Sequence, residues 1–149
     1  EWAAAIGAGV VACATIFALA YRRSPAAQAL LYGIVCGAVF GYLAVFSKVA
    51  VDAFAAGGLP AMLATWQFWA MVATSLIGTV VQQYAFGAGV LSRSLPAMKI
   101  VEPLIALFLG LSILGEYLQV ESIFGWLVMG ASIGGMLVAT GMLARKPVA

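Results

Sequence analysis

The sequence predicts an all-α protein, a polytopic membrane helix bundle with five transmembrane helices, its N-terminus outside and its C-terminus cytoplasmic. Hydrophobic residues make up 65% of the 149 residues, and only 8% are charged. So little polar surface cannot coat a water-soluble globule, and we therefore expect lipid to surround most of the chain. The apolar runs are long and continuous rather than alternating, which favours helices over a β-barrel.

Four breaks divide the apolar pattern into five segments, each long enough to cross a bilayer, which takes about 20 residues. The breaks are short stretches rich in charged residues, Ser, Gly or Pro: Arg22–Pro25, Gly57–Pro60, Ser92–Ser94 and Gly115–Glu116. The predicted spans, in chain order, are residues 2–21, 27–54, 62–90, 94–115 and 121–144. The second and third exceed the bilayer thickness, which indicates tilt or ends that project into the headgroup layer.

Loop charges favour the same five-helix threading, because short cytoplasmic loops collect Lys and Arg. With the first residue outside, every Lys or Arg of a loop falls on the inner side: Arg22, Arg23, Arg93, Arg145 and Lys146. Acidic residues fall on the outer side: Glu1, Asp52, Glu116 and Glu121. Four or six helices would scatter these charges over both faces. We therefore expect one direction of insertion, as a multi-pass protein of the plasma (inner) membrane.

Small residues at four-residue spacing predict close helix packing in two places. The second span carries Gly33, Gly37 and Gly41, and the fifth carries Gly130 and Gly134. Such stripes let a neighbouring backbone approach, either within one bundle or between two copies of the chain, and both interpretations stay open. Lys48 follows Gly41 by about two turns, so we expect it to point into the bundle from the same face.

Once the charged residues at the loops and outer ends are assigned, three ionisable residues remain: Lys48 near the outer end of the second span, and Lys99 and Glu102 inside the fourth. Each costs a few kcal/mol in lipid, so we expect it to face a partner or a watery cavity. The spacing of Lys99 and Glu102 allows a direct ion pair, and Pro103 frees the carbonyl group of Lys99. This arrangement is either a self-neutralising structural pair or a polar site on a kinked helix.

The third span supplies a polar stripe that ends in Gln82 and Gln83. If the third and fourth spans fold directly back on each other, Gln82 lies about level with Glu102, and a polar layer forms between the two helices. Interhelical hydrogen bonding and contact with a substrate are both open interpretations of this stripe.

Other classes of function find little support in the sequence. The chain has no His, and Cys13 and Cys36 lie in apolar runs, so we predict buried apolar thiols, no metal site and no cofactor. Phosphate-binding loops, paired catalytic carboxylates and nucleophile elbows are missing, so we predict no enzyme activity. No basic cluster is large enough to indicate nucleic-acid binding.

Several short sequences, in this order and spacing, resemble the drug/metabolite transporter superfamily of the EamA-like and NIPA-like type. They are Phe46-Ser47-Lys48, the stretch Gln82–Gly89, Ser94-Leu95-Pro96-Ala97, Val101-Glu102-Pro103-Leu104 and Leu114-Gly115-Glu116. The resemblance implies a carrier of nine or ten helices in two inverted halves, which moves small metabolites, drugs or ions by alternating access without ATP hydrolysis. It implies that residues 27–149 form the second-half repeat of four helices, and that residues 1–26 form the last helix of a missing first half and a cytoplasmic loop.

The same resemblance implies a set of substrate-pathway residues: Lys48, Gln82, Gln83, Lys99, Glu102 and Pro103. Expected partners are the lipid bilayer, a small-molecule substrate or ion, and either the missing first half, a second copy or a larger membrane complex. Two other functions stay open. The chain could be a non-transporting accessory subunit of a larger membrane complex, or it could pass a divalent cation such as magnesium, which requires acidic residues in a pore, where only Glu102 qualifies.

Overall fold

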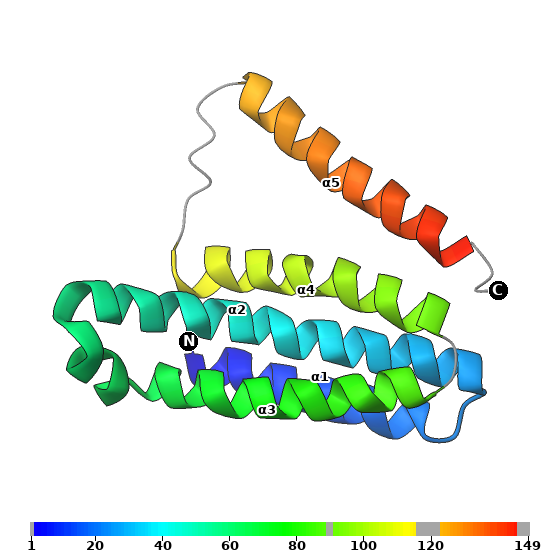
Figure 1. Cartoon of the computed structure of the whole chain (residues 1–149), viewed down its shortest axis with the longest axis horizontal. Coiled ribbons are helices and arrows are strands. Elements are labelled where there is room, and N and C mark those ends of the chain that lie inside the picture. The colour runs from blue at the N-terminus through cyan, green and yellow to red at the C-terminus, as the bar shows by residue number, and fades with distance from the viewer. Residues whose placement is uncertain (1, 89–90, 116–122, 146–149) are drawn as a thin grey trace.

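The computed structural model describes residues 2–88, 91–115 and 123–145, and these residues form an all-α bundle (Figure 1). Its helices, in chain order, are α1 (Trp2–Ala20), α2 (Pro25–Ala64), α3 (Trp66–Gly87), α4 (Leu91–Ile113) and α5 (Ile123–Arg145). The predicted all-α class with five helices is confirmed. Four residues used in the charge argument lie outside the described residues: Glu1, Glu116, Glu121 and Lys146.

The predicted break after the second span is present, but the chain continues helically beyond it. Gly57 (φ −149°, ψ 18°) and Gly58 (φ 68°, ψ −162°) leave the helical conformation inside α2. A positive φ with ψ near −160° is a region that is essentially restricted to glycine. The backbone then turns helical again as far as Ala64, so α3 begins at Trp66 instead of residue 62.

The predicted break at Ser92–Ser94 is wrong in position. α3 ends at Gly87 and α4 already begins at Leu91, so these three residues belong to the first turn of α4. Polar residues fit there because the first amide groups of a helix have no partner within the helix and tolerate a wet environment.

Four of the five helices are long and apolar enough to cross a membrane, namely α1, α2, α4 and α5, which makes this a membrane protein. α3 has 22 residues but falls outside that group. Its sequence carries the polar stripe that includes Thr74, Thr79, Gln82 and Gln83. The hydroxyl group of Thr79 donates a hydrogen bond to the carbonyl oxygen of Ser75 (2.9 Å), which lowers the cost of placing that polar group in lipid.

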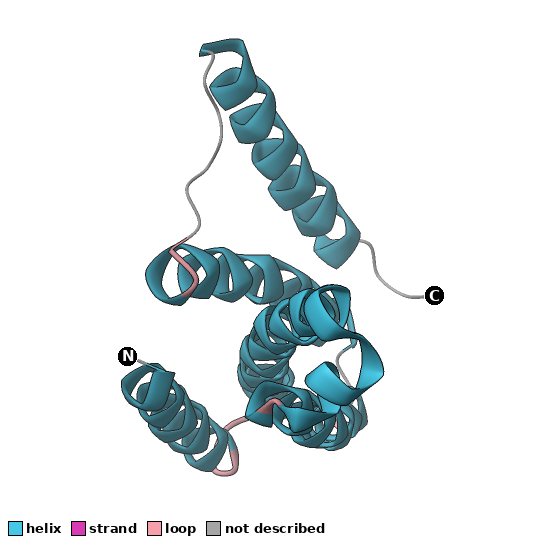
Figure 2. Ribbon diagram, turned by 90° about the vertical axis from the view of Figure 1, so that its left-hand side faces the viewer, coloured by secondary structure: helices cyan, strands magenta, loops and turns pink. Residues whose placement is uncertain are grey.

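α2 is the central helix, and it packs against α1, α3 and α4. α3 and α4 share few contacts because α2 lies between them along most of their length (Figure 1). The expectation that these two helices fold directly together, with Gln82 and Glu102 in one polar layer, is therefore wrong. α5 contacts α4 and slopes away from the other helices (Figure 2).

The physical reason for this order is the glycine stripe of α2, which accepts the backbone of α4. A Cβ atom built on Gly33 would lie 2.5 Å from the carbonyl oxygen of Ser94, and one on Gly37 would lie 2.6 Å from that of Met98. Only glycine permits this approach, which is closer than real Cβ contacts allow. Gly130 and Gly134 of α5, by contrast, have no atom within 4 Å of such a Cβ atom.

Two small cores hold the bundle together. The middle core contains Val35, Cys36, Val81 and Met98, so it joins α2, α3 and α4. Cys36 Sγ lies 3.3 Å from Met98 Sδ and 3.8 Å from the carbonyl oxygen of Gly78. Because lipid is as apolar as these side chains, their close van der Waals packing, together with the glycine-mediated approach of α2 and α4, holds the helices together, and not removal from water.

Aromatic rings connect the helices at the end of the bundle that contains Trp2. Trp2 of α1 stacks on Phe46 of α2 with ring centroids 5.8 Å apart, and it meets Trp66 of α3 edge-on at 5.5 Å. Phe46 and Trp66 are also in edge contact at 5.9 Å. Such ring pairs contribute about 0.5–1.5 kcal/mol each beyond burial, and they tie the start of α1 and of α3 to the middle of α2.

Candidate functional site

The strongest polar feature within a membrane helix is the ion pair between Lys99 and Glu102, which lies in the middle of α4. Lys99 Nζ is 3.2 Å from Glu102 Oε2, one helical turn away. The two side chains are 60% and 32% exposed, respectively. The pair therefore forms as its spacing predicts, but this chain does not bury it.

The ion pair leaves capacity for further bonds. An ammonium group carries three N–H donors, and among the described residues only the Glu102 carboxylate accepts one of them from Lys99. Two donors of Lys99 thus remain for water or for a ligand. In a hydrocarbon environment such groups must be covered by protein or must face a wet cavity.

The backbone of Glu102 is fixed against α2, so the pair sits on a rigid support. A Cβ atom on Gly37 would lie 3.1 Å from the Glu102 amide nitrogen, and one on Gly41 would lie 2.9 Å from its carbonyl oxygen. Both glycines are buried, whereas Lys99 is exposed. The glycine stripe of α2 therefore contacts one face of α4, and the charged side chains of Lys99 and Glu102 lie beside this contact.

Pro96 and Pro103 lie inside α4. Pro103 has no N–H group, so the carbonyl oxygen of Lys99, four residues earlier, lacks its regular helical donor. Pro103 is exposed and lies one turn after Lys99. A cationic side chain, an acidic side chain and a freed carbonyl oxygen are thus grouped on about one turn of a membrane helix.

The other predicted pathway residues do not join this group within the chain. Gln82 is half-buried and Gln83 is exposed, both on α3, and α2 separates them from the pair. The expectation that Lys48 points into the bundle is wrong: Lys48 is exposed on α2, although Gly41, two turns earlier, is buried. The structure therefore brings together Lys99, Glu102 and Pro103, and leaves Lys48, Gln82 and Gln83 at other places on the bundle.

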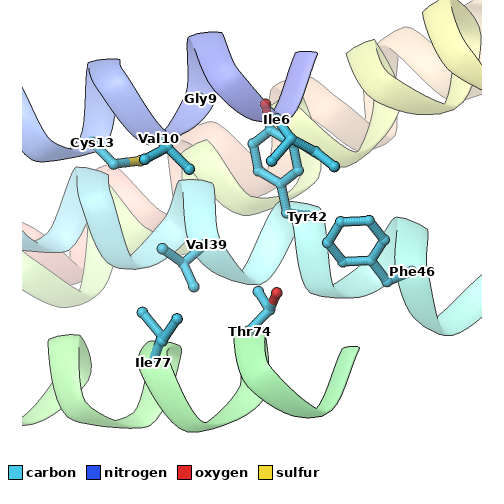
Figure 3. A pocket seen from close by; sticks show the side chains of 9 residues that line it. All are labelled: Ile6, Gly9, Val10, Cys13, Val39, Tyr42, Phe46, Thr74 and Ile77. Atoms are coloured by element: carbon cyan, nitrogen blue, oxygen red, sulfur yellow. The ribbon is translucent and has the colours of Figure 1, made fainter. Parts of the chain in front are cut away.

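An apolar cavity of about 260 Å³ lies between α1, α2 and α3, and the sequence did not predict it (Figure 3). Ile6, Val10 and Cys13 line one wall, and Val39, Tyr42 and Ile77 face them (Figure 3). The Tyr42 hydroxyl donates a hydrogen bond to the carbonyl oxygen of Ala5 (2.7 Å). Because residues of three helices form this cavity, no local sequence motif predicts it. The one sequence feature that could have indicated it is Tyr42, a tyrosine inside an apolar helix.

Metal binding finds no support in the described ranges. Within residues 2–88, 91–115 and 123–145, no group of three or more His, Cys, Asp or Glu side chains converges on one point. Glu102 has Lys99 as its neighbour, and a cation would have to displace that ammonium group.

Comparison with known proteins gives one informative match. The chain is 42% identical over 145 residues to an uncharacterized protein of Corynebacterium glutamicum, and the alignment covers 97% of this chain and 50% of the relative. The chain thus spans about half the length of the curated relative that it matches. No protein-family model matches the sequence, and no solved structure matches it.

Proposed function

We propose that this chain is one half of a secondary membrane transporter that moves a small organic solute by alternating access. The observation that carries the proposal is the Lys99–Glu102 pair in the middle of a proline-containing membrane helix, where the lysine side chain is 60% exposed. Charge at that depth is costly, and it is a frequent mark of substrate and ion pathways.

Because Lys99 and Glu102 lie on an exposed side of α4, we expect another part of the protein to cover them or water to surround them. If this side faced acyl chains, the two unused donors of Lys99 would lose all hydrogen bonding, which costs several kcal/mol in a membrane. A second half that covers this side would enclose the pair, the freed carbonyl oxygen and water in one cavity. Lys99 would then bind an anionic or carbonyl group of the solute, and Glu102 would bind a cationic group or accept a proton.

The length of the relative agrees with a two-half protein. A homologue about twice as long as the aligned segment is what an architecture of two repeats requires. In this proposal the chain supplies the second repeat, and α1 belongs to the first. The resemblance to the drug/metabolite transporter superfamily points to the same architecture.

In this proposal the protein crosses the inner membrane five times. The Arg22–Arg23 turn lies on the cytoplasmic side, and the Gly57–Gly58 turn lies on the outer side. α3 is then the third span although it is not among the four most apolar helices, because one of its faces packs along α2 through Gly78, Val81 and Ala85. A helix partly covered by protein tolerates more polar residues than a helix surrounded by lipid.

Uptake by the full-length protein in proteoliposomes tests the proposal. Screening with a mixture of organic solutes identifies a substrate, and Glu102→Gln and Lys99→Met are then compared with the unaltered protein. We expect each variant to fold with an unchanged elution profile and to lose at least tenfold in uptake. Normal uptake by both folded variants would assign the pair a purely structural role and remove the main support for transport.

An accessory-subunit function is the second candidate, and the open face of α5 favours it. Gly130, Gly134 and Gly135 have free space where a Cβ atom would lie, so another helix could approach this face closely. Mild-detergent purification from native membrane distinguishes the two functions, because a stoichiometric large partner would indicate a subunit. Divalent-cation passage ranks third, and uptake of magnesium by the same proteoliposomes tests it.

A further inference from the structure

A second cavity, of about 550 Å³, opens at the end of the bundle that carries the Arg22–Arg23 turn. Phe17, Tyr32 and Tyr84 form an aromatic wall, and Gln28, Gln83 and the backbone near Tyr21 form a polar part. The cavity therefore joins apolar and polar linings at the level where the helices end. From this geometry we propose that it binds the headgroup region of an anionic phospholipid.

The rings of the aromatic wall contact one another. The ring centroid of Phe17 lies 4.8 Å from that of Tyr32 and 5.6 Å from that of Tyr84. Tyr32 is buried together with Ala20 and Ala85, in the second core of the bundle. Tyr84 remains 56% exposed, so the wall continues from the cavity onto the lipid-facing surface. This continuity suits a ligand whose polar head enters the cavity while its chains stay in the bilayer.

The polar part of the cavity offers donors. Gln28 Nε2 donates a hydrogen bond to the carbonyl oxygen of Tyr21 (3.3 Å), which leaves one N–H of that amide for a ligand among the described contacts. Gln83 is exposed at the same cavity. Tyrosines and carboxamides at this depth are suited to the glycerol and ester region, because an interfacial ring has one apolar and one polar side.

Positive charge dominates this end of the bundle. Arg22 and Arg23 directly follow Tyr21, which lines the cavity; both are exposed, and neither forms an ion pair with another described residue. α2 begins at Pro25, so the positive end of its dipole lies beside them. The described acidic residues, Asp52 and Glu102, lie in the outer half of α2 and in the middle of α4.

Charge and position together select a lipid. Basic pockets between membrane helices bind anionic headgroups, and each arginine near the surface strengthens such binding by about fivefold. A soluble phosphate would match the arginines but would leave the aromatic wall unused. A zwitterionic lipid would match the wall but would gain little from the arginines.

Lipid binding to the purified full-length protein tests this proposal. Native mass spectrometry and thermal unfolding are measured in detergent with added phosphatidylglycerol, with phosphatidylcholine of the same acyl chains, and with glycerol 3-phosphate. The test variant is Arg22→Gln/Arg23→Gln. The control is Arg93→Gln, which removes one positive charge in the first turn of α4, at a residue that does not line the cavity.

We expect phosphatidylglycerol to bind in preference to phosphatidylcholine, and the double variant to weaken that binding by about 25-fold, from two arginines at about fivefold each. Arg93→Gln should change it by less than about threefold, and Arg22→Lys/Arg23→Lys should retain most of it because the charge is kept.

Equal binding of both lipids would overturn the proposal. Equal losses in the control and the double variant would also overturn it, by indicating general surface attraction. Competition by glycerol 3-phosphate would indicate a soluble-anion site instead of a lipid site.

Discussion

The backbone of Gly37 lies directly against that of Met98, so that a Cβ atom at Gly37 would lie 2.6 Å from the Met98 carbonyl oxygen. Glu102 follows Met98 by one helical turn, and its own amide and carbonyl groups face Gly37 and Gly41. The approach of the two backbones therefore determines where the charged turn of α4 lies. Packing of α2 against α4 and placement of the Lys99–Glu102 pair are one structural feature.

Replacing Gly37 by Ala should destabilise the protein. A methyl group there would overlap backbone atoms of α4, which cannot move as a flexible side chain would, so α4 would shift outward at a cost of about 1–3 kcal/mol. Thermal unfolding in detergent, monitored by circular dichroism, measures the loss. Gly7→Ala is the matched control, because nothing lies within 4 Å of a Cβ atom at that position. Equal melting temperatures for the two variants would contradict the observed α2–α4 contact.

Exchanging the two charges of α4 separates a structural pair from a functional one. In Lys99→Glu/Glu102→Lys the ion pair can re-form at the same spacing. The acidic residue would then precede the basic one, which is the more favourable direction along a helix by a few tenths of a kcal/mol. We expect the melting temperature to be equal or slightly higher. If the chain is the proposed transporter, uptake should fall at least tenfold, because the cation and the anion of the proposed solute site have changed places.

Each single reversal is the control for this exchange. Lys99→Glu and Glu102→Lys place two like charges one turn apart, so both should lower the melting temperature, and the double variant should restore it. Full uptake by the double variant would show that the pair serves only to neutralise itself.

Replacing Pro103 by Ala should separate stability from transport. Alanine restores an N–H group that can donate to the Lys99 carbonyl oxygen, and it suits a helix interior by up to about 3 kcal/mol more than proline. We expect an equal or higher melting temperature and a lower uptake rate, because the freed carbonyl oxygen and any bend of α4 would be lost. Pro25→Ala is the control, since Pro25 occupies the first turn of α2, where no helical bond is missing. Uptake that is unchanged in Pro103→Ala would exclude a role for this proline in the pathway.

Local patterns in the sequence predicted the helices, the α2 glycine stripe and the Lys99–Glu102 pair, because each depends on spacings within one helix. The same reasoning placed Gln82 beside Glu102, on the assumption that helices adjacent in sequence pack together. α2 lies between them, because its glycines accept α4 on one side while Gly78 of α3 lies against Val39 and Phe40. Which surfaces meet is decided by several helices at once, and the two cavities among α1, α2 and α3 arise in the same way.

The direction in which the chain crosses the membrane can be tested by thiol labelling in intact cells. Ser24 lies in the exposed turn before α2, and Leu59 is 54% exposed just after the Gly57–Gly58 break. We expect a membrane-impermeant maleimide added from outside to label Leu59→Cys and to leave Ser24→Cys unlabelled until the cells are permeabilised. The unaltered protein is the control for Cys36, which is buried, and for Cys13, which is partly buried. Labelling of Ser24→Cys in intact cells, with Leu59→Cys protected, would reverse the orientation and place the arginine-rich end of the bundle outside, contrary to the preference of short cytoplasmic loops for Lys and Arg.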